Sequence, residues 1–203
     1  MEFPTISVIT PTLGRATLVR TMQSVLPQLG PADEWLIVGD GSRPAARELL
    51  ERTGERRITY FESTDARSAY GNAQRNAAMR RAQNEFLVFV DDDDELLPGA
   101  LAAVRREGTH RLPMMFRMNY RPRNAILWRV PLLREANVGG GMFVTPNRRD
   151  RLADWPIYDD RHSLGYGASD FQFIQRTLAL WPANSLRWCR DVIYCCPQHG
   201  RGQ

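Results

Sequence analysis

The first half of the chain alternates between short apolar runs and longer segments in which apolar residues recur at helical spacing. Four runs rich in β-branched or aromatic residues are typical of buried strands, at 5–10, 35–38, 58–61 and 86–90. The segments after them repeat apolar positions every three or four residues, which predicts helices at 12–29, 45–53, 69–83 and 96–107. Strands that alternate with helices indicate βαβ units, so we predict a Rossmann-like α/β fold with a mostly parallel sheet flanked by helices.

Beyond residue 110 this periodicity weakens. Short strands are predicted near 126–130 and 142–145, glycines occupy 139–141, and a helix is predicted at 169–181. The sequence shows no repeat or low-complexity tract that would divide the chain. With 203 residues it fits one compact domain, 1–203, that is large enough to bury its own core.

Polar residues directly follow three of the predicted strands. Residues 12–15 come after the first strand, 40–42 after the second and 91–94 after the fourth. The carboxyl ends of parallel strands lie at one edge of a sheet, which is where open α/β sheets bind ligands. We therefore expect these three segments to meet and form one site.

Residues 91–94 are four consecutive aspartates at the end of an apolar strand. Like charges so close together repel one another and destabilise the fold unless something compensates them. A hard divalent cation such as Mn²⁺ or Mg²⁺ prefers oxygen ligands and supplies that compensation. The alternative is a solvated acidic loop whose charges favour the N-terminus of the following helix.

Composition adds a local charge asymmetry. All 27 basic residues are arginine, and the formal net charge is +4. Residues 1–110 carry 13 arginines and 16 acids, whereas 111–151 carry nine arginines and two acids. Clustered arginine suits phosphate-bearing partners through bidentate hydrogen bonds, although an arginine-biased composition gives the same counts. We expect 111–151 to form a basic wall beside the site.

Two further features concern the compartment. Cys189, Cys195 and Cys196 lie near the C-terminus with neither metal-site spacing nor an even disulfide framework. The sequence has no apolar run of about 18 residues, and its first ten residues lack the basic start of a signal peptide. These features lead us to expect a cytoplasmic protein without a transmembrane segment.

Three stretches of the chain resemble, in order and spacing, the motifs of inverting GT-A glycosyltransferases of the family-two type: VITPTLGR, LIVGDGS and YGNAQRNAAMRRAQNEFLVFVDDDDELLPGAL. The resemblance covers residues 4–105. It implies a GT-A fold in which 1–105 bind a nucleotide-sugar and 106–203 form a reduced acceptor-side half. It also implies transfer of a sugar from a nucleotide diphosphate, UDP- or GDP-linked, to an acceptor hydroxyl.

The resemblance implies nucleotide contacts at particular positions. Pro11 and Thr12 would lie near the base, and Asp40 would form a hydrogen bond with it. Many members have Asp-Asp-Gly-Ser here, whereas this chain has Gly39 in the first place, so one polar contact is expected to be missing. Arg75, at the usual Arg-Asn position, would meet the nucleotide or its phosphates, and otherwise it is a solvated helix residue.

The same resemblance implies a metal site. Asp91 aligns with the first aspartate of Asp-x-Asp, expected near the ribose, and Asp93 with the second, the expected ligand of Mn²⁺ or Mg²⁺. Asp94 is a weaker candidate that would support the ligands through a hydrogen bond. His199 lies in the C-terminal CCPQHGRGQ, where many GT-A enzymes bring a histidine back to the metal. The alternative for His199 is a frayed tail residue.

On the acceptor side the resemblance is weaker. Inverting members place an acidic general base at the start of a helix behind a Gly-rich segment, and GYGASDFQFIQRTLAL offers Asp170 there, with Ser169 replacing a first acid. Asp170 would accept the proton of the acceptor hydroxyl, or it is a first-turn acid that favours the helix. Asp159 and Asp160 are alternative bases. Trp155 is either an acceptor-side or a core residue.

No motif specifies the acceptor. The chain is short for this fold, and an open site beside arginine-rich 111–151 suits a large anionic acceptor, either modified DNA or a phosphorylated glycan or lipid head group. Two other classes compete with the transferase. A nucleotidyltransferase needs a longer Gly-rich loop than PTLGR, and a non-catalytic nucleic-acid or anionic-polymer binder would use a degenerate glycosyltransferase scaffold without needing the aspartates.

Overall fold

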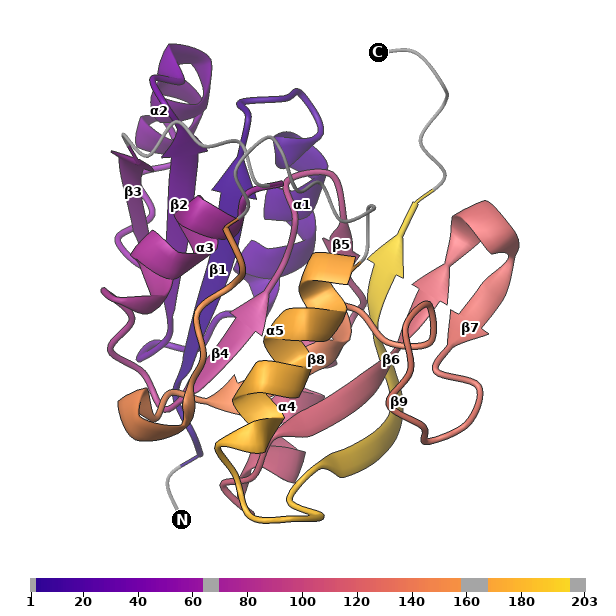
Figure 1. Ribbon diagram of the computed structural model, residues 1–203. Coiled ribbons are helices and arrows are strands. Elements are labelled where there is room, and N and C mark those ends of the chain that lie inside the picture. The colour runs from indigo at the N-terminus through magenta and orange to yellow at the C-terminus, as the bar shows by residue number, and fades with distance from the viewer. Residues whose placement is uncertain (1–2, 64–69, 158–167, 198–203) are drawn as a thin grey trace.

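The computed structural model describes residues 3–63, 70–157 and 168–197 (Figure 1). Its first part contains β1 (Ile6–Thr12), α1 (Leu18–Val25), the 3₁₀ helix η1 (Leu26–Gln28), β2 (Glu34–Asp40), α2 (Pro44–Glu51), β3 (Ile58–Ser63), α3 (Asn72–Met79), β4 (Phe86–Phe89), β5 (Glu95–Leu96) and α4 (Ala100–Gly108). Its second part contains β6 (Met114–Tyr120), η2 (Arg121–Arg123), β7 (Ala125–Leu127), η3 (Gly140–Met142), β8 (Phe143–Pro146), η4 (Arg149–Arg151), α5 (Ala168–Ala179) and β9 (Arg187–Cys196).

The described strands form one sheet in the order β3-β2-β1-β4-β8-β6-β9-β5, with β7 beside β6. β3, β2, β1 and β4 pair in parallel, as the alternation of strands and helices predicts. Beyond β4 the pairing is mixed, because β8 is antiparallel to both β4 and β6 while β6 and β9 are parallel. The α/β fold with flanking helices is confirmed, and its purely parallel part is the four-strand half.

β6 and β9 have no counterpart among the predicted strands. β6 carries Arg117 within a methionine-rich run, and β9 carries Arg190 and Asp191 in its middle, so neither resembles a continuous apolar strand. They pair with each other although they are far apart in the sequence. Burial against distant neighbours decides strand formation here, because β propensity depends strongly on such context.

Two helices begin later than their periodicity predicts. Residues 13–17 form a loop before α1, and Gly14 within it has a φ of +75°. Glu95 and Leu96 pair with β9 as a strand, and Gly99, with a φ of +81°, precedes α4. The chain around the carboxyl ends of β1 and β4 is therefore loop rather than helix. Among the described helices, none is long and apolar enough to cross a membrane.

Aromatic side chains fix α5 on the sheet. Trp155 is 1% exposed and stacks on Phe173 of α5, with ring centroids 4.1 Å apart. Phe89 of β4 meets both rings edge-on, and such aromatic pairs stabilise beyond their buried area. Trp155 is thus a core residue. α5 lies in front of β8 in Figure 1, and this packing holds its first turn against the sheet.

Candidate active site

The carboxyl ends of β1, β2 and β4 lie side by side at one edge of the sheet. Thr12 pairs with Gly39 across β1 and β2, and Val90 donates its N–H to Ile9 O (2.9 Å) just before Asp91. Thr12, Asp40 and the four aspartates therefore lie at one edge, as the strand order predicts.

Three of the four aspartates converge. Asp91, Asp93 and Asp94 each offer a carboxylate oxygen, and these atoms lie within 4.8 Å of one another. Asp94 is 7% exposed, and burial together with the charge of Asp91 raises its pKa well above the ordinary range. Hard oxygen donors that crowd in this way fit a divalent cation such as Mn²⁺ or Mg²⁺. This geometry places Asp94 among the potential ligands themselves, a closer position than the sequence indicates.

Tyr194 of β9 forms hydrogen bonds with two residues of this cluster. Its hydroxyl donates to Asp94 Oδ2 (2.7 Å) and accepts the Asp91 N–H (3.2 Å). Its ring lies so close to Gly141 that a Cβ on that glycine would overlap it. The Gly-rich segment and the aspartates are thus linked through one tyrosine, a role that the sequence alone does not indicate because β9 is not predicted.

Asp92 has a different role from its neighbours. It is 4% exposed, and its Oδ2 accepts the Thr12 hydroxyl (2.7 Å) and the Leu13 N–H (2.9 Å). Thr12 Oγ1 in turn accepts the Gly14 N–H (2.9 Å), so the loop after β1 is held to the loop after β4. The side chain of Thr12 is therefore engaged within the protein. Sequence reasoning does not separate Asp92 from the other three, because four identical residues carry no local signal of which one turns inward.

Arg15 lies over the outer side of the cluster. Its Nη1 is 3.0 Å from Asp93 Oδ2 and 3.4 Å from Asp92 Oδ1, and its side chain is half-exposed. Arg15 comes from the loop between β1 and α1, at the same edge as the nucleotide contacts expected for Pro11 and Thr12. A positive charge thus already faces Asp93, the residue with the strongest sequence evidence for metal binding.

Arg75 of α3 is buried rather than solvated. It is 5% exposed, forms an ion pair with Asp91 and lies 4.7 Å from the ring centroid of Trp155. Its Nη1 donates to Tyr70 O (2.8 Å) and Asn72 Oδ1 (3.2 Å). These contacts exclude the alternative that Arg75 is a solvated helix residue, and they place its guanidinium beside the Asp91 carboxylate.

Asp170 occupies the first turn of α5, close enough to Arg75 that the charges of the two side chains interact. Its Oδ2 accepts the Gly140 N–H (2.8 Å), and burial raises the pKa of its carboxyl although the charge of Arg75 opposes that rise. A Cβ on Gly140 would lie 2.6 Å from the Trp155 ring. Glycine is needed there because backbone, carboxylate and indole approach closely. The structure thus brings the predicted base and the predicted donor residues around one arginine.

The expected base-binding position differs from the family pattern for a steric reason. Asp40 Oδ1 accepts a hydrogen bond from Gln74 Nε2 (2.8 Å), so its carboxylate is oriented by α3. A Cβ on Gly39 would lie only 2.7 Å from the Tyr60 hydroxyl and 3.2 Å from Glu62 Cγ. Side chains of β3 therefore occupy the space that an aspartate at position 39 would use.

Three of the predicted candidates lie outside the described residues: His199, Asp159 and Asp160. Their proposed roles as a metal ligand and as alternative bases stay predictions.

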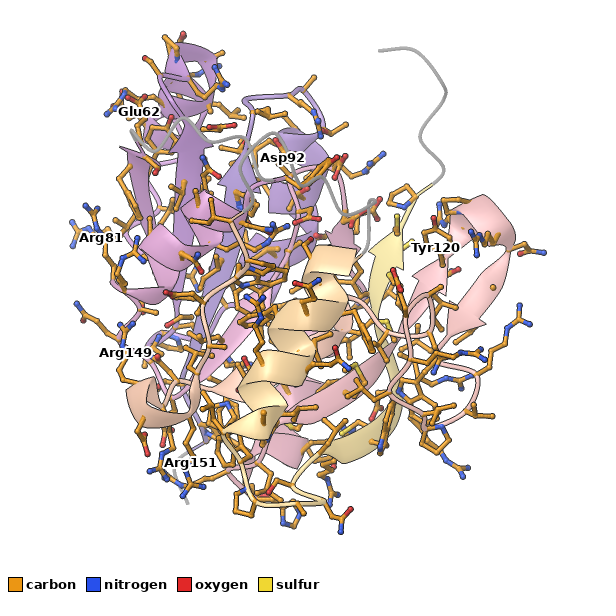
Figure 2. All side chains as sticks on the ribbon, viewed as in Figure 1. Glu62, Arg81, Asp92, Tyr120, Arg149 and Arg151 are labelled. Carbon is orange, nitrogen blue, oxygen red and sulfur yellow. The ribbon has the colours of Figure 1, made fainter. Side chains whose placement is uncertain are left out.

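The expected single basic wall over 111–151 is wrong. Arg149 and Arg151 follow Asn147, whose N–H donates to Glu85 O (2.8 Å) at the amino end of β4, the edge opposite Asp91. Figure 2 shows both arginines at the far end of the molecule from Asp92. The arginines of 111–151 are therefore divided between different parts of the molecule, because β8 returns the chain to the start of β4.

Residues 7–108 match the sequence model of the family described as glycosyl transferase family 2. A GalNAc(5)-diNAcBac-PP-undecaprenol beta-1,3-glucosyltransferase of Campylobacter jejuni is 29% identical over 116 residues. That alignment covers 56% of this chain and 37% of the relative, so the chain spans well under half of the relative's length.

Solved structures share the fold over almost the whole chain. Residues 1–349 of TarS from S. aureus, in complex with UDP-GlcNAc, give a TM-score of 0.74 at 17% identity, covering 97% of this chain and 60% of that one. The mannosyltransferase PcManGT from Pyrobaculum calidifontis, in complex with GDP-Man and Mn²⁺, gives 0.71 at 22% identity, covering 100% and 59%. The matched family model spans half of the sequence, and the chain therefore belongs to glycosyl transferase family 2, with the GT-A fold that its motifs predict.

Proposed function

We propose that this chain is a metal-dependent inverting glycosyltransferase that moves a sugar from UDP or GDP to an acceptor hydroxyl. The observation that carries the proposal is the arrangement around Arg75. Arg75 forms an ion pair with Asp91, one of three crowded carboxylates, and its charge also interacts with that of Asp170. A site with a cation-binding end and a proton-accepting end matches what displacement of a nucleoside diphosphate requires.

The donor end would hold the nucleotide through residues of three strand ends. Asp40, oriented by Gln74, would accept a hydrogen bond from the base, and the chain at Pro11 and Thr12, whose side chains are buried, would lie near that base. Asp93 and Asp94, with Asp91 beside them, would hold Mn²⁺ or Mg²⁺, which neutralises charge on the leaving diphosphate. Support comes from two neighbours with this fold, whose structures contain UDP-GlcNAc and GDP-Man with Mn²⁺.

Asp170 would act as the general base. The acceptor oxygen would attack the anomeric carbon while the bond from that carbon to the diphosphate oxygen breaks, which inverts the configuration. The proton of the acceptor hydroxyl would pass to the Asp170 carboxylate, which the Gly140 N–H holds in place. A raised pKa makes this carboxylate a stronger proton acceptor than an ordinary aspartate. Arg75 would keep Asp91 and Asp170, both acidic, from repelling one another across the site.

We propose a phosphate-bearing glycan or lipid-linked glycan as the acceptor. The Campylobacter relative is named for a PP-undecaprenol-linked glycan, and the acceptor-side hairpin of this chain carries exposed arginines. Phosphate groups are the partners that arginine recognises best.

The test is a screen for donor hydrolysis. The purified chain is incubated with UDP-, GDP- and dTDP-sugars with and without Mn²⁺, and released nucleoside diphosphate is measured. Mn²⁺-dependent release from one donor class, together with a Mn²⁺-dependent rise of melting temperature with the same nucleotide, supports the proposal. Retention on DNA or heparin that persists in an Asp91→Asn/Asp93→Asn variant, without any donor response, favours a non-catalytic polyanion binder instead.

A further inference from the structure

The loop that follows β7, residues 129–134, carries apolar side chains that are exposed to solvent. Val130 is 52% exposed and Leu132 is 51% exposed, with the exposed Pro131 between them. One exposed aliphatic residue is ordinary on a protein surface, but adjacent ones that project from the same loop indicate an interaction surface.

The protein holds this loop in its outward conformation. Asn137, which is 3% exposed, accepts the Arg129 N–H at Oδ1 (3.2 Å) and donates from Nδ2 to Val130 O (3.1 Å) and Leu132 O (2.7 Å). At the start of the loop, buried Trp128 donates from Nε1 to Met115 O (3.1 Å). A buried amide that makes three hydrogen bonds to the backbone fixes the loop and keeps its aliphatic side chains from turning into the core.

The surroundings of the loop are positively charged. Arg129 and Arg134 flank the aliphatic residues and are exposed, as are Arg121 and Arg123 at the turn between β6 and β7. Glu135 is the single acidic residue in the sequence between Arg111 and Arg149. Exposed apolar side chains flanked by Arg129 and Arg134 match the interface of an anionic membrane, where the aliphatic groups enter the head-group boundary and the guanidinium groups meet phosphates.

The loop is continuous with the acceptor side of the site. Asn137 is followed by Val138, Gly139 and Gly140, and the Gly140 N–H holds Asp170. A surface that contacted this loop would therefore lie beside the segment that positions the predicted base.

We propose that residues 129–134 dock the chain on an anionic lipid bilayer, which places a lipid-borne acceptor next to Asp170. The choice of acceptor rests on the proposed function, whereas the docking itself does not. A soluble polyanion such as DNA would use the arginines but would gain little from Val130 and Leu132. A membrane interface uses both kinds of side chain, and it explains why they occur together on a loop held rigid by Asn137.

The test is flotation of the full chain with vesicles of phosphatidylcholine, with and without phosphatidylglycerol. The chain is expected to bind the anionic vesicles and not the neutral ones. Val130→Ser/Leu132→Ser is expected to raise the lipid concentration for half-binding by about tenfold or more, since buried aliphatic groups drive interfacial binding. Arg129→Gln/Arg134→Gln is expected to raise it by about fivefold for each charge removed.

Matched controls lie elsewhere on the molecule. Leu180 is 47% exposed, and Arg148 and Arg149 are exposed at the opposite edge of the sheet, so Leu180→Ser and Arg148→Gln/Arg149→Gln should change half-binding by less than about twofold. All variants should retain the wild-type melting temperature because they change solvent-exposed side chains. Failure of the wild-type chain to bind vesicles, equal binding to neutral vesicles, or equal losses in the controls would overturn the proposal. So would arginine-dependent binding to DNA or heparin alone. Donor hydrolysis without vesicles is measured in parallel, because its absence counts against the proposed function and not against docking.

Discussion

Two parts of the molecule are rich in charge but use it in opposite ways: the proposed donor edge, made of Asp40 and residues 91–94, and the proposed acceptor-side hairpin of β6 and β7. At the donor edge most of the charges are wholly or partly buried and are paired within the protein, as in the contact of Asp92 with Thr12 and the ion pair of Arg75 with Asp91. On the hairpin Arg121, Arg123 and their neighbours are exposed. Buried, paired charge fixes geometry and resists salt, whereas exposed charge acts on partners and is screened.

This comparison predicts that substitutions at the donor edge and at Asp170 change donor binding and turnover. Substitutions on the hairpin are expected to change acceptor binding instead. Five experiments sharpen the difference within the site itself.

The largest effect is expected at Asp170. Asp170→Asn keeps the shape and removes the proton acceptor, so turnover should fall on the order of 10²–10⁴-fold while donor affinity changes little. The measurement is kcat together with nucleotide-sugar affinity by calorimetry. Lost donor binding with near-normal turnover would instead assign Asp170 to holding Gly140 and the start of α5.

The same residue predicts a pH profile. The base must be ionised to accept a proton, so kcat should fall as pH decreases through the pKa of Asp170. Because burial raises that pKa, the acidic limb should lie above the range of an ordinary aspartate. A profile of kcat against pH that is flat down to about pH 4 would contradict this role.

Asp93 is expected to show the next largest effect. Asp93→Asn removes one of the clustered oxygen ligands, so Mn²⁺-dependent nucleotide affinity should fall by about 100-fold with little change in melting temperature. Asp92→Asn is the matched control, because it alters the neighbouring residue that holds Thr12 and Leu13. That variant should lose thermal stability. If both variants lost only metal binding, the separation of the two aspartates would be wrong.

Substitution of Arg15 should change the affinities for Mn²⁺ and for nucleotide in opposite directions. Its guanidinium repels a cation at Asp93 and attracts a diphosphate, so Arg15→Gln should tighten Mn²⁺ binding and weaken nucleotide binding, each by about fivefold for a half-exposed charge. Titrating Mn²⁺ by calorimetry and nucleotide by thermal shift separates the two. Arg148→Gln, at an ion pair of similar exposure far from the site, serves as the control. A shift of both affinities in the same direction would indicate a structural role for Arg15.

The smallest effect concerns stability. Burial raises the pKa of Asp94, which means that its charged form is disfavoured in the folded state. Asp94→Asn should therefore raise the melting temperature without metal by about 3 °C, equivalent to about 1 kcal/mol for a chain of this size. It should also reduce the stabilisation by Mn²⁺. A lower melting temperature would show that the hydrogen bond with Tyr194 outweighs the charge that is removed.

The sequence by itself determined the parallel part of the sheet and the polar residues at its edge. Contiguous apolar runs made β1, β2 and β4 recognisable, and the rule that ligands bind at the carboxyl ends of parallel strands then placed Thr12, Asp40 and the aspartates at one edge. The resemblance to the family also singled out Asp170, which lies in the first turn of α5, as the expected base. These features are local, so they can be read from neighbouring residues.

Only the tertiary structure decided the rest. β6 and β9 form because distant strands bury them. The position of β9 brings Tyr194 into contact with Asp91 and Asp94. The return of β8 to β4 carries Arg149 and Arg151 away from the site. The different roles of four identical aspartates depend on which backbone groups each one faces. Such choices depend on packing between residues far apart in the chain, and local pattern carries no information about them.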